Sequence, residues 1–321
     1  MKKYTLTSSL PSLPLLLTPS TLMPKVSESV TPRAKCAPVE SYGAIDHWQP
    51  VRLMAEGHWT RVFQARPEGS PDDWPSDYVL KVLKSEYEDD AMAARQIQQE
   101  AVVGSQVTHP NLVSVLSSRV EGSPLYVVMP HLEGVTLASL LMSTTQLCIP
   151  QALWIARQTA EALRALHLAG WMHADVKPSN LLVNRQGHAT VVDLGFARSF
   201  EKPNEQRIEL VGTMNYAAPE VFIDNCGRDG QCDVYSLGVT LFEMLTGRLP
   251  FVEEDATQLA LAHLREELPE PRTFNPNLPP RLVRLLKKMM AKEPVRRPRV
   301  DELVSILYEL EIDTFDMRSV G

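Results

Sequence analysis

The sequence is poor in cysteine, lacks a long apolar run and has no excess of basic residues. Its four cysteines form no C-x-x-C pair, so neither a disulfide scaffold nor a structural zinc site is expected. No apolar run is long enough to span a bilayer. Acidic residues outnumber basic ones, 39 to 32. This balance argues against nucleic-acid binding through a globally basic surface.

The composition is otherwise that of a soluble globular protein. Hydrophobic residues make up 44% and charged residues 22% of the 321 residues, which is enough apolar material for a sizeable core and excludes a mainly disordered chain. The length is about twice that of a typical domain, so two lobes or two domains are expected. Cys226 and Cys232 flank a glycine-containing turn and are interpreted as free thiols, which places the protein in a reducing cytoplasm.

The N-terminal segment, residues 1–46, is rich in Ser, Thr and Pro and has no lasting periodicity, which predicts a disordered leader. A secretory signal is the alternative, since Met1–Lys3 is basic and Leu13–Leu17 is apolar. Prolines interrupt this short apolar region, and no small-residue cleavage site follows it. The leader is therefore the preferred interpretation, and a short tail is expected at residues 312–321.

Hydrophobic patterning changes character along the chain. Residues 48–128 show short β-type runs and one helical stretch after Asp90, and from Pro150 onward apolar residues recur at three- and four-residue spacing. A small β-rich front and a larger helical back predict an α+β protein with a cleft between two lobes. The predicted elements include strands at 51–54, 59–65, 78–83, 112–116 and 125–128, and later helices at 233–245, 282–290 and 300–310.

Residues suited to phosphate chemistry gather in the second half of the chain. The segment His173–Asn180 carries an acid at Asp175 and an amide at Asn180, and a predicted hairpin with its turn at 184–187 follows. The second strand of that hairpin ends on Asp193. A hairpin that brings two acids and an amide together can hold a magnesium ion and a nucleophile, because Mg²⁺ prefers oxygen ligands and keeps substrate phosphate in its shell.

A second pair of charges stands in the front half. Lys81 shares a strand face with Val79 and Leu83, and a charge on an apolar face needs a partner or a path to water. Glu100 falls on the apolar face of the helix after Asp90, where an unpaired carboxylate would be costly. An ion pair between Lys81 and Glu100 would resolve both problems.

Together these segments resemble the protein kinase family, and within it the Ser/Thr branch of bacterial type. The resemblance runs from about Trp48 to Leu310, with the motifs in order at family spacing. The motifs are His173-Ala-Asp-Val-Lys-Pro-Ser-Asn180 for H-R-D-x-K-x-x-N, Asp193-Leu-Gly195 for D-F-G, Gly212-Thr213-Met-Asn-Tyr216 for G-T-x-x-Y, Ala218-Pro-Glu220 for A-P-E, Asp233-Val-Tyr-Ser-Leu-Gly238 for the buried helix start, and Pro294-Val-Arg-Arg297-Pro298 for P-x-x-R-P, whose Arg usually pairs with the A-P-E Glu.

The resemblance implies a kinase domain at 47–311, with a small β-rich N-lobe at 47–130 that contains one key helix and a larger, mainly helical C-lobe at 134–311. It implies phosphoryl transfer from ATP, with Mg²⁺, to Ser/Thr hydroxyls of protein substrates in signalling. The implied metal ligands are Asn180 and Asp193, and the implied catalytic group is Asp175, Lys177, Lys81, Glu100 and Thr213. The implied ATP-binding residues are Ala55, Gly57, Val62, Val79, Lys81, Met129, Pro130, Leu132, Leu182 and Asp193.

Two departures from the family pattern bear on activity. In the glycine-rich loop, normally G-x-G-x-x-G-x-V, the segment Ala55–Val62 keeps only Gly57. Gly104 stands where the family usually places an apolar side chain, so a hole and a mobile helix are expected there. These departures favour a pseudokinase scaffold or a nucleotide-sensing module, whereas the complete set of charged residues favours an active enzyme. A third possibility, a small-molecule kinase, conflicts with the motifs at 212–220 and 297–298.

Overall fold

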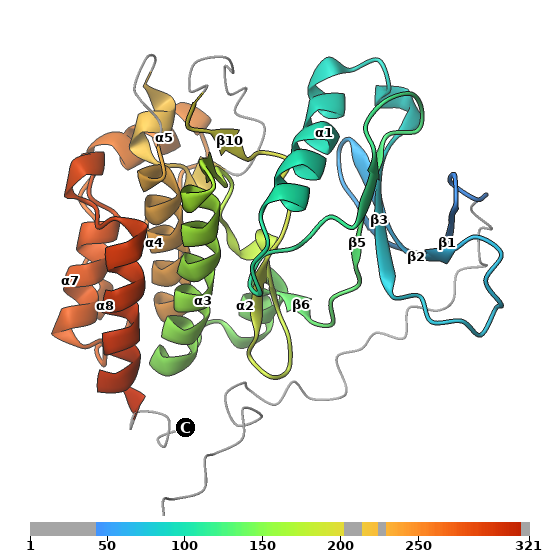
Figure 1. Cartoon of the computed structure of the whole chain (residues 1–321). Coiled ribbons are helices and arrows are strands. Elements are labelled where there is room, and N and C mark those ends of the chain that lie inside the picture. Colours follow the sequence, from blue (N-terminus) through green and yellow to red (C-terminus); the bar gives the residue numbers. More distant parts are fainter. Residues whose placement is uncertain (1–42, 202–213, 224–228, 316–321) are drawn as a thin grey trace, which may run out of the picture.

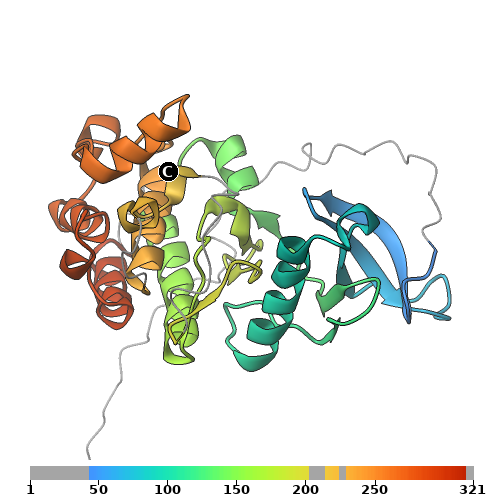
Figure 2. The same ribbon diagram turned by 90° about the horizontal axis from the view of Figure 1, so that it is seen from above.

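The chain folds into two lobes that differ in secondary structure (Figure 1). The structure, a computed structural model, describes residues 43–201, 214–223 and 229–315. The N-lobe is mainly sheet and the C-lobe mainly helical, and helix α1 (Ala91–Gln106) lies between the sheet and the C-lobe in both views (Figure 2). The predicted bilobal α+β architecture is confirmed.

A five-stranded antiparallel sheet forms the N-lobe, in the order β1-β2-β3-β5-β4. Along β3, Leu80 and Val82 belong to a buried cluster with Phe63 and Tyr126. Because side chains alternate along a strand, Lys81 projects from the opposite face. The strands are β1 (Trp48–Glu56), β2 (Thr60–Pro67), β3 (Tyr78–Leu83), β4 (Ser117–Arg119) and β5 (Tyr126–Pro130).

The strand predicted at 112–116 is wrong, because the edge strand β4 begins only at Ser117. Residues 112–116 instead connect three parts of the molecule. The Val113 N–H donates to Val191 O in the C-lobe, the Val115 N–H donates to Gly104 O in α1, and the Leu116 N–H donates to Val128 O in β5. Leu112 and Val113 are both buried. The apolar composition of this run therefore reflects burial against several elements, which periodicity cannot distinguish from a buried strand.

Helix α1 begins at a side-chain cap. The Asp90 carboxylate accepts hydrogen bonds from the backbone N–H groups of Met92 and Ala93, which have no partner within the helix. The face toward the molecule carries small and aliphatic residues, including Ala93 and Ile97, together with the buried Glu100. The cap and the apolar stripe explain why this stretch forms the single long helix of the N-lobe within the described residues.

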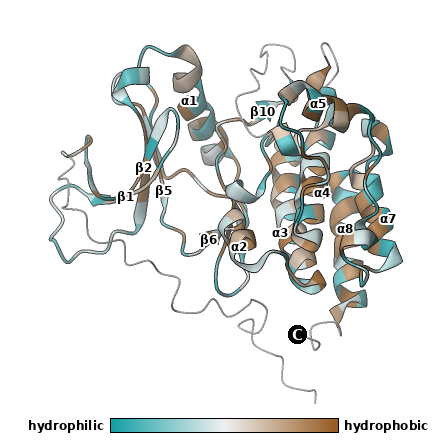
Figure 3. Cartoon of the chain, turned by 180° about the vertical axis from the view of Figure 1, so that it is seen from behind, coloured by the Kyte–Doolittle hydropathy of each residue, from teal (hydrophilic) through white to brown (hydrophobic). Residues whose placement is uncertain are grey.

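Two long helices, α3 (Ile149–Leu168) and α4 (Gln231–Thr246), form the centre of the C-lobe. Hydrophobic residues concentrate along both (Figure 3), and nearly all of α4 is buried. The predicted helices at 233–245, 282–290 and 300–310 are confirmed with slightly shifted ends. The other helices are α2 (Leu137–Thr144), α5 (Ala256–Arg265), α6 (Pro271–Phe274), α7 (Pro280–Met289) and α8 (Val300–Asp313).

Short strands line the C-lobe where it meets the N-lobe. A three-stranded sheet has the order β6-β8-β9, and a separate pair joins β7 to β10. The predicted hairpin is confirmed, since β8 pairs antiparallel with β9 across the turn at 184–187. The strands are β6 (Val135–Thr136), β7 (Trp171–Met172), β8 (Leu181–Val183), β9 (Ala189–Val191) and β10 (Arg198–Ser199).

The chain contacts the sheet before the predicted start of the domain. Ile45 and Trp48 exchange backbone hydrogen bonds, and the Tyr126 hydroxyl donates to Asp46 at 2.8 Å. At the other end α8 continues to Asp313. Residues 1–42 and 316–321 lie outside the described residues, so the proposed leader, tail and domain boundaries stay predictions. No helix within the described ranges has the length and apolar character needed to cross a membrane.

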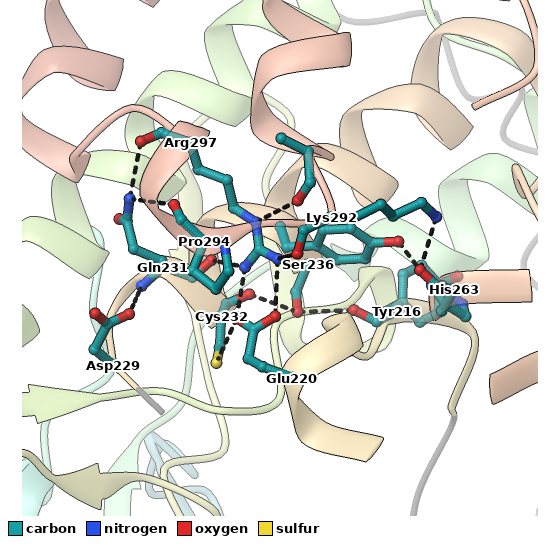
Figure 4. Close-up of polar contacts among 12 residues, drawn as sticks. Tyr216, Glu220, Asp229, Gln231, Cys232, Ser236, His263, Lys292, Pro294 and Arg297 are labelled. Carbon is teal, nitrogen blue, oxygen red and sulfur yellow. Dashed lines mark hydrogen bonds and ion pairs between the residues drawn. The ribbon is translucent and has the colours of Figure 1, made fainter. Parts of the chain in front are cut away.

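A buried ion pair joins the segment after residue 214 to the C-terminal part of the C-lobe (Figure 4). The Arg297 guanidinium donates to both Glu220 oxygens at 2.6 and 2.8 Å, and the side chains are 0% and 2% exposed. The remaining N–H groups of Arg297 reach the carbonyl oxygens of Ala291, Gln231 and Lys292. The pairing implied by the family resemblance is therefore present. Because the guanidinium is so fully hydrogen-bonded, its burial cost is offset.

Removing one partner of this pair should strongly destabilise the fold. We expect Glu220→Ala to lower the free energy of unfolding by about 3–5 kcal/mol, because the charge of Arg297 stays buried without compensation. The matched control is Glu270→Ala, whose partner Lys287 is at 2.7 Å in a pair that is about half exposed. That loss should be much smaller, because a solvent-exposed ion pair contributes little to stability. Urea denaturation of both variants measures the difference, and similar losses would contradict the assignment.

Candidate active site

The loop His173–Asn180 is fixed by a buried carboxylate at the start of α4. Asp233 accepts hydrogen bonds from the backbone N–H groups of His173 and Ala174 at 2.9 and 2.8 Å, and from His167 Nε2 at 2.8 Å. Ala174 has φ of 66°, a left-handed conformation that is costly for a residue with a side chain. Although burial opposes its charge, the bonds from His167 and His173 hold the pKa of Asp233 below its ordinary value.

Within this loop, Asp175 contacts two other polar side chains. Its Oδ2 lies 2.8 Å from Lys177 Nζ, and Asn180 Nδ2 donates to the same oxygen at 2.8 Å and to the Asp175 carbonyl at 2.9 Å. Burial raises the pKa of Asp175 above its ordinary value, and the nearby Asp193 acts in the same direction, while Lys177 opposes the rise. A carboxylate with a raised pKa suits a group that accepts a proton.

Lys81 lies between two carboxylates that come from different parts of the chain. Its Nζ is 2.6 Å from Glu100 Oε2 on α1 and 2.8 Å from Asp193 Oδ1 after β9. The predicted Lys81–Glu100 ion pair is therefore present. Burial alone would disfavour the lysine charge, but Asp193 and Glu100 together raise the pKa of Lys81. Burial likewise opposes the charge of Asp193, and Lys81 holds the pKa of that carboxyl below its ordinary value.

The β8–β9 hairpin sets Asn180 and Asp193 side by side. Leu181 pairs with Val191 across the hairpin, and the Val192 N–H donates to Asn180 O at 2.9 Å. The flanking residues Asn180 and Asp193 consequently lie at the same end of the hairpin, as predicted. Asp193 adopts φ of 65°, so the backbone turns sharply there, and such strained positions cluster at functional sites.

The donor set at this end suits a magnesium ion that is shared with a phosphate. Asp193 offers carboxylate oxygen, and Asn180 offers its side-chain carbonyl while its nitrogen serves Asp175. No group of three or more His, Cys, Asp or Glu side chains within the described ranges could hold a metal ion. A cation here would take only part of its ligands from the protein, as Mg²⁺ does when phosphate oxygens and water complete the shell.

The residues predicted to contact ATP lie on one face of the N-lobe sheet and at its link to the C-lobe. Strand register places Ala55 opposite Val62, Val62 opposite Lys81, and Val79 opposite Met129. Directly opposed residues project to the same face, so these positions form one surface. Gly57 lies in the β1–β2 turn, where its N–H donates to Thr60 O. The chain then passes through Pro130 and Leu132 toward the C-lobe, and Leu182 lies on β8.

Comparison with known proteins agrees with this geometry. The sequence pattern of the protein kinase domain matches residues 48–308. The chain belongs to the protein kinase domain family.

Bacterial relatives of this kinase domain place it with the Ser/Thr branch, as predicted. It is 33% identical to the serine/threonine-protein kinase PrkC of Bacillus subtilis (strain 168) over 253 residues, which are 78% of this chain and 38% of PrkC. It is 35% identical to the serine/threonine-protein kinase PknA of Mycobacterium tuberculosis (strain CDC 1551 / Oshkosh) over 256 residues, 77% of this chain and 57% of PknA. The chain therefore spans about two fifths to three fifths of the length of these relatives.

Not every predicted feature of the kinase domain is found. The hole expected at Gly104 is wrong, because a Cβ built there would lie 2.5 Å from Val115 Cγ2. The space is filled from a neighbouring segment that sequence patterning placed in a strand. Thr213, predicted to support Asp175 and Lys177, lies outside the described residues, so its place stays a prediction.

One functional contribution was not predicted from the sequence. Asp233 was identified only as part of a buried helix start, whereas it holds the backbone of His173 and Ala174 in the kinase domain. An ionisable residue followed by a nearly uninterrupted apolar helix is the feature that could have indicated this role, since a buried carboxylate needs several donors.

Lys81→Met should destabilise the kinase domain by of the order of 3 kcal/mol near neutral pH, because two carboxylates lose their common partner. Because the pKa of Lys81 is raised on folding, the lysine contributes fully to the stability of the fold below its ordinary pKa of 10.5. Because the pKa of Asp193 is lowered on folding, this carboxylate contributes fully above its ordinary pKa of 3.8. The loss should therefore be complete at neutral pH and shrink only as the pH falls below 3.8, toward the lowered pKa of Asp193. Urea denaturation at several pH values measures this trend.

The control for that series is Lys287→Met, which breaks the exposed pair with Glu270. Its effect should be small at every pH. A Lys81→Met loss that does not change between neutral and acidic pH would contradict the charge-sharing arrangement.

Proposed function

We propose that this protein transfers the γ-phosphoryl group of ATP to Ser or Thr hydroxyls of protein substrates in signalling. The observation that carries the proposal is the position of Asp193. It pairs with Lys81 from the N-lobe and lies at the same end of the β8–β9 hairpin as Asn180, which donates a hydrogen bond to Asp175 in the C-lobe. A phosphate-binding cation, a metal-binding carboxylate and a proton acceptor are thereby gathered around one point. The names of the bacterial relatives support the same reaction class.

Phosphoryl transfer needs positioning and charge neutralisation more than covalent chemistry from the protein. Lys81, oriented by Glu100, is proposed to bind the α- and β-phosphates. Asp193 and Asn180 are proposed to hold Mg²⁺, which neutralises phosphate charge when bound. Each of these side chains is already held at 2.6–2.9 Å by a neighbour. Little reorganisation is then required when the nucleotide binds.

Asp175 is proposed to orient the substrate hydroxyl and to accept its proton, and Lys177 to meet the γ-phosphate. Their 2.8 Å contact keeps the two side chains together at the point where the hydroxyl and the phosphate would meet. Thr213 is proposed to support both from the substrate side. Asn180 restrains the Asp175 carboxylate through its amide nitrogen, so the proton acceptor and the metal ligand are positioned by one contact.

The adenine ring is proposed to lie under the sheet face that carries Val62 and Val79, with Ala55 and Gly57 at the loop above the phosphates. Leu182 on β8 would cover the ring from the C-lobe side. Met129 would stand at the back of the pocket, and the backbone near Pro130 and Leu132 would meet the adenine edge. Pro130 has no N–H, so its carbonyl would serve as the acceptor at that position.

The cytoplasm is the proposed location. ATP is available there, and Cys232, which forms no disulfide, is compatible with a reducing compartment. The family pattern supports ATP and protein as substrates, and the oxygen donor set supports Mg²⁺ as the metal. The alternative of a pseudokinase gains no support from the site, since Lys81, Glu100 and Asp193 are in contact and Asp175 is held by Asn180.

The proposal is tested by incubating the protein and Asp175→Asn with labelled ATP, Mg²⁺ and a generic protein substrate. We expect the variant to lose about 10²–10⁴-fold in rate, the usual contribution of a positioned proton acceptor. The matched control is Asp255→Asn, which changes the cap of α5 and should retain full activity, because Asn caps helices as well as Asp. Equal background labelling by all proteins would favour a pseudokinase, and label on a metabolite would favour a small-molecule kinase.

The pH dependence of the reaction tests the role of Asp175 separately. Burial raises the pKa of Asp175 and Lys177 opposes that rise, so Lys177→Met should raise the pKa further. Because Asp175 accepts a proton only as a carboxylate, the rate is lost as the pH falls through this pKa. The acidic limb of the kcat–pH profile should therefore move to higher pH in Lys177→Met and stay near the wild-type position in Lys177→Arg. An unmoved limb in Lys177→Met would remove Asp175 from this role.

A further inference from the structure

The Lys81–Glu100 pair depends on where α1 lies, because Lys81 belongs to the sheet and Glu100 to the helix. A shift of α1 would separate the two charges while leaving each element intact. Gly104 follows Glu100 by one turn, and residues four apart lie on the same side of a helix. What packs against Gly104 therefore bears directly on the position of Glu100.

The segment that packs there is anchored on both sides of Val115. The Val113 N–H donates to Val191 O at 2.9 Å in β9, the strand that leads to Asp193. The Leu116 N–H donates to Val128 O at 2.8 Å in β5. Val115 is thus held between a C-lobe strand and the N-lobe sheet by two hydrogen bonds of its neighbours that do not involve α1.

The contact between Val115 and α1 is both polar and steric. The Val115 N–H donates to Gly104 O at 3.0 Å, and this carbonyl is in the last turn of the helix, where acceptors have no partner within the helix. A Cβ at Gly104 would lie 2.5 Å from Val115 Cγ2, 3.1 Å from its Cβ and 3.3 Å from its backbone nitrogen. While valine stands opposite, only glycine permits this approach, because the overlap with Cγ2 is severe and a β-branched side chain has little rotamer freedom to relieve it, whereas the contacts with Cβ and the backbone nitrogen require a shift of only tenths of an ångström.

We propose that Gly104 and Val115 form an interlocking joint that sets the position of α1 and so keeps Glu100 in contact with Lys81. Both are positioning residues, since they act through the ion pair and not on the nucleotide. The joint lies entirely within the chain, so α1 is held in its paired position without a partner protein. The glycine is then the element that fixes this helix closely against its neighbour.

Helix propensity and the joint give opposite predictions for Gly104→Ala. Alanine favours helix over glycine, so propensity alone would predict a firmer α1 and unchanged activity. The joint instead predicts a collision with Val115 that pushes α1 outward. We expect the KM for ATP to rise and kcat/KM to fall about tenfold, the size of a typical coupling between residues in contact. Ser105→Ala is the control, because it changes an exposed position in the same turn and should leave both constants unchanged.

The decisive variant is Gly104→Ala combined with Val115→Ala, in which the methyl group added on the helix meets the space vacated by the valine. We expect the double variant to recover most of the activity lost by Gly104→Ala, with the KM for ATP returning toward the wild-type value. A general loss of stability cannot produce this recovery, because each substitution on its own removes a native contact or adds a clash.

Amide hydrogen exchange of residues 91–106 does not depend on turnover. It therefore tests the proposed joint even if the proposed kinase function is wrong. Exchange of α1 should be faster in Gly104→Ala than in the wild type and slower again in the double variant. If Gly104→Ala does not fold, folding of the double variant supports the joint and its failure to fold opposes it. Wild-type exchange and activity in Gly104→Ala, or a double variant no better than Gly104→Ala, would overturn the proposal.

Discussion

Lys81 is shared by two carboxylates that come from different parts of the chain, one from α1 and one from the end of β9. A buried ammonium with a single partner would have a large desolvation cost, and two acidic partners without the ammonium would repel each other. The three charges are therefore stable only together. Since Lys81 belongs to the sheet and Asp193 to the C-lobe, this interaction also connects the two lobes at the point where a nucleotide phosphate is proposed to bind.

The C-lobe side of the site is held by buried polar groups that the reaction itself does not use. Asp233 fixes two successive backbone N–H groups of the loop that carries Asp175, including the left-handed Ala174. Glu220 and Arg297 fix the segment after residue 214 against the last helices. Such groups are costly to bury, but when fully hydrogen-bonded they define one arrangement and exclude others. A rigid loop is what a reaction governed by positioning requires.

The N-lobe side is held differently, by close packing between α1 and the segment 111–116. Gly104 lacks the side chain expected from the family pattern, and Val115 fills the space from outside the helix. The same segment makes hydrogen bonds to β9 and β5. Because protein interiors are close-packed, a displacement of Val115 would be transmitted to α1. The position of Glu100 therefore depends on a contact that involves no charged group.

The sequence by itself determined the two-lobe architecture, the family and the set of polar residues in the site. These depend on local order: alternation in β3, helical spacing after Asp90 and the fixed spacing from Asp175 to Asn180 and Asp193, which one hairpin converts into proximity. The contacts of Asp233 and Val115 were decided only by the tertiary structure. Each of these residues contacts a segment that is distant in the sequence, and no local pattern connects the two. Whether a valine fits against a glycine depends on how closely the two backbones approach, and the packing of the whole domain sets that distance.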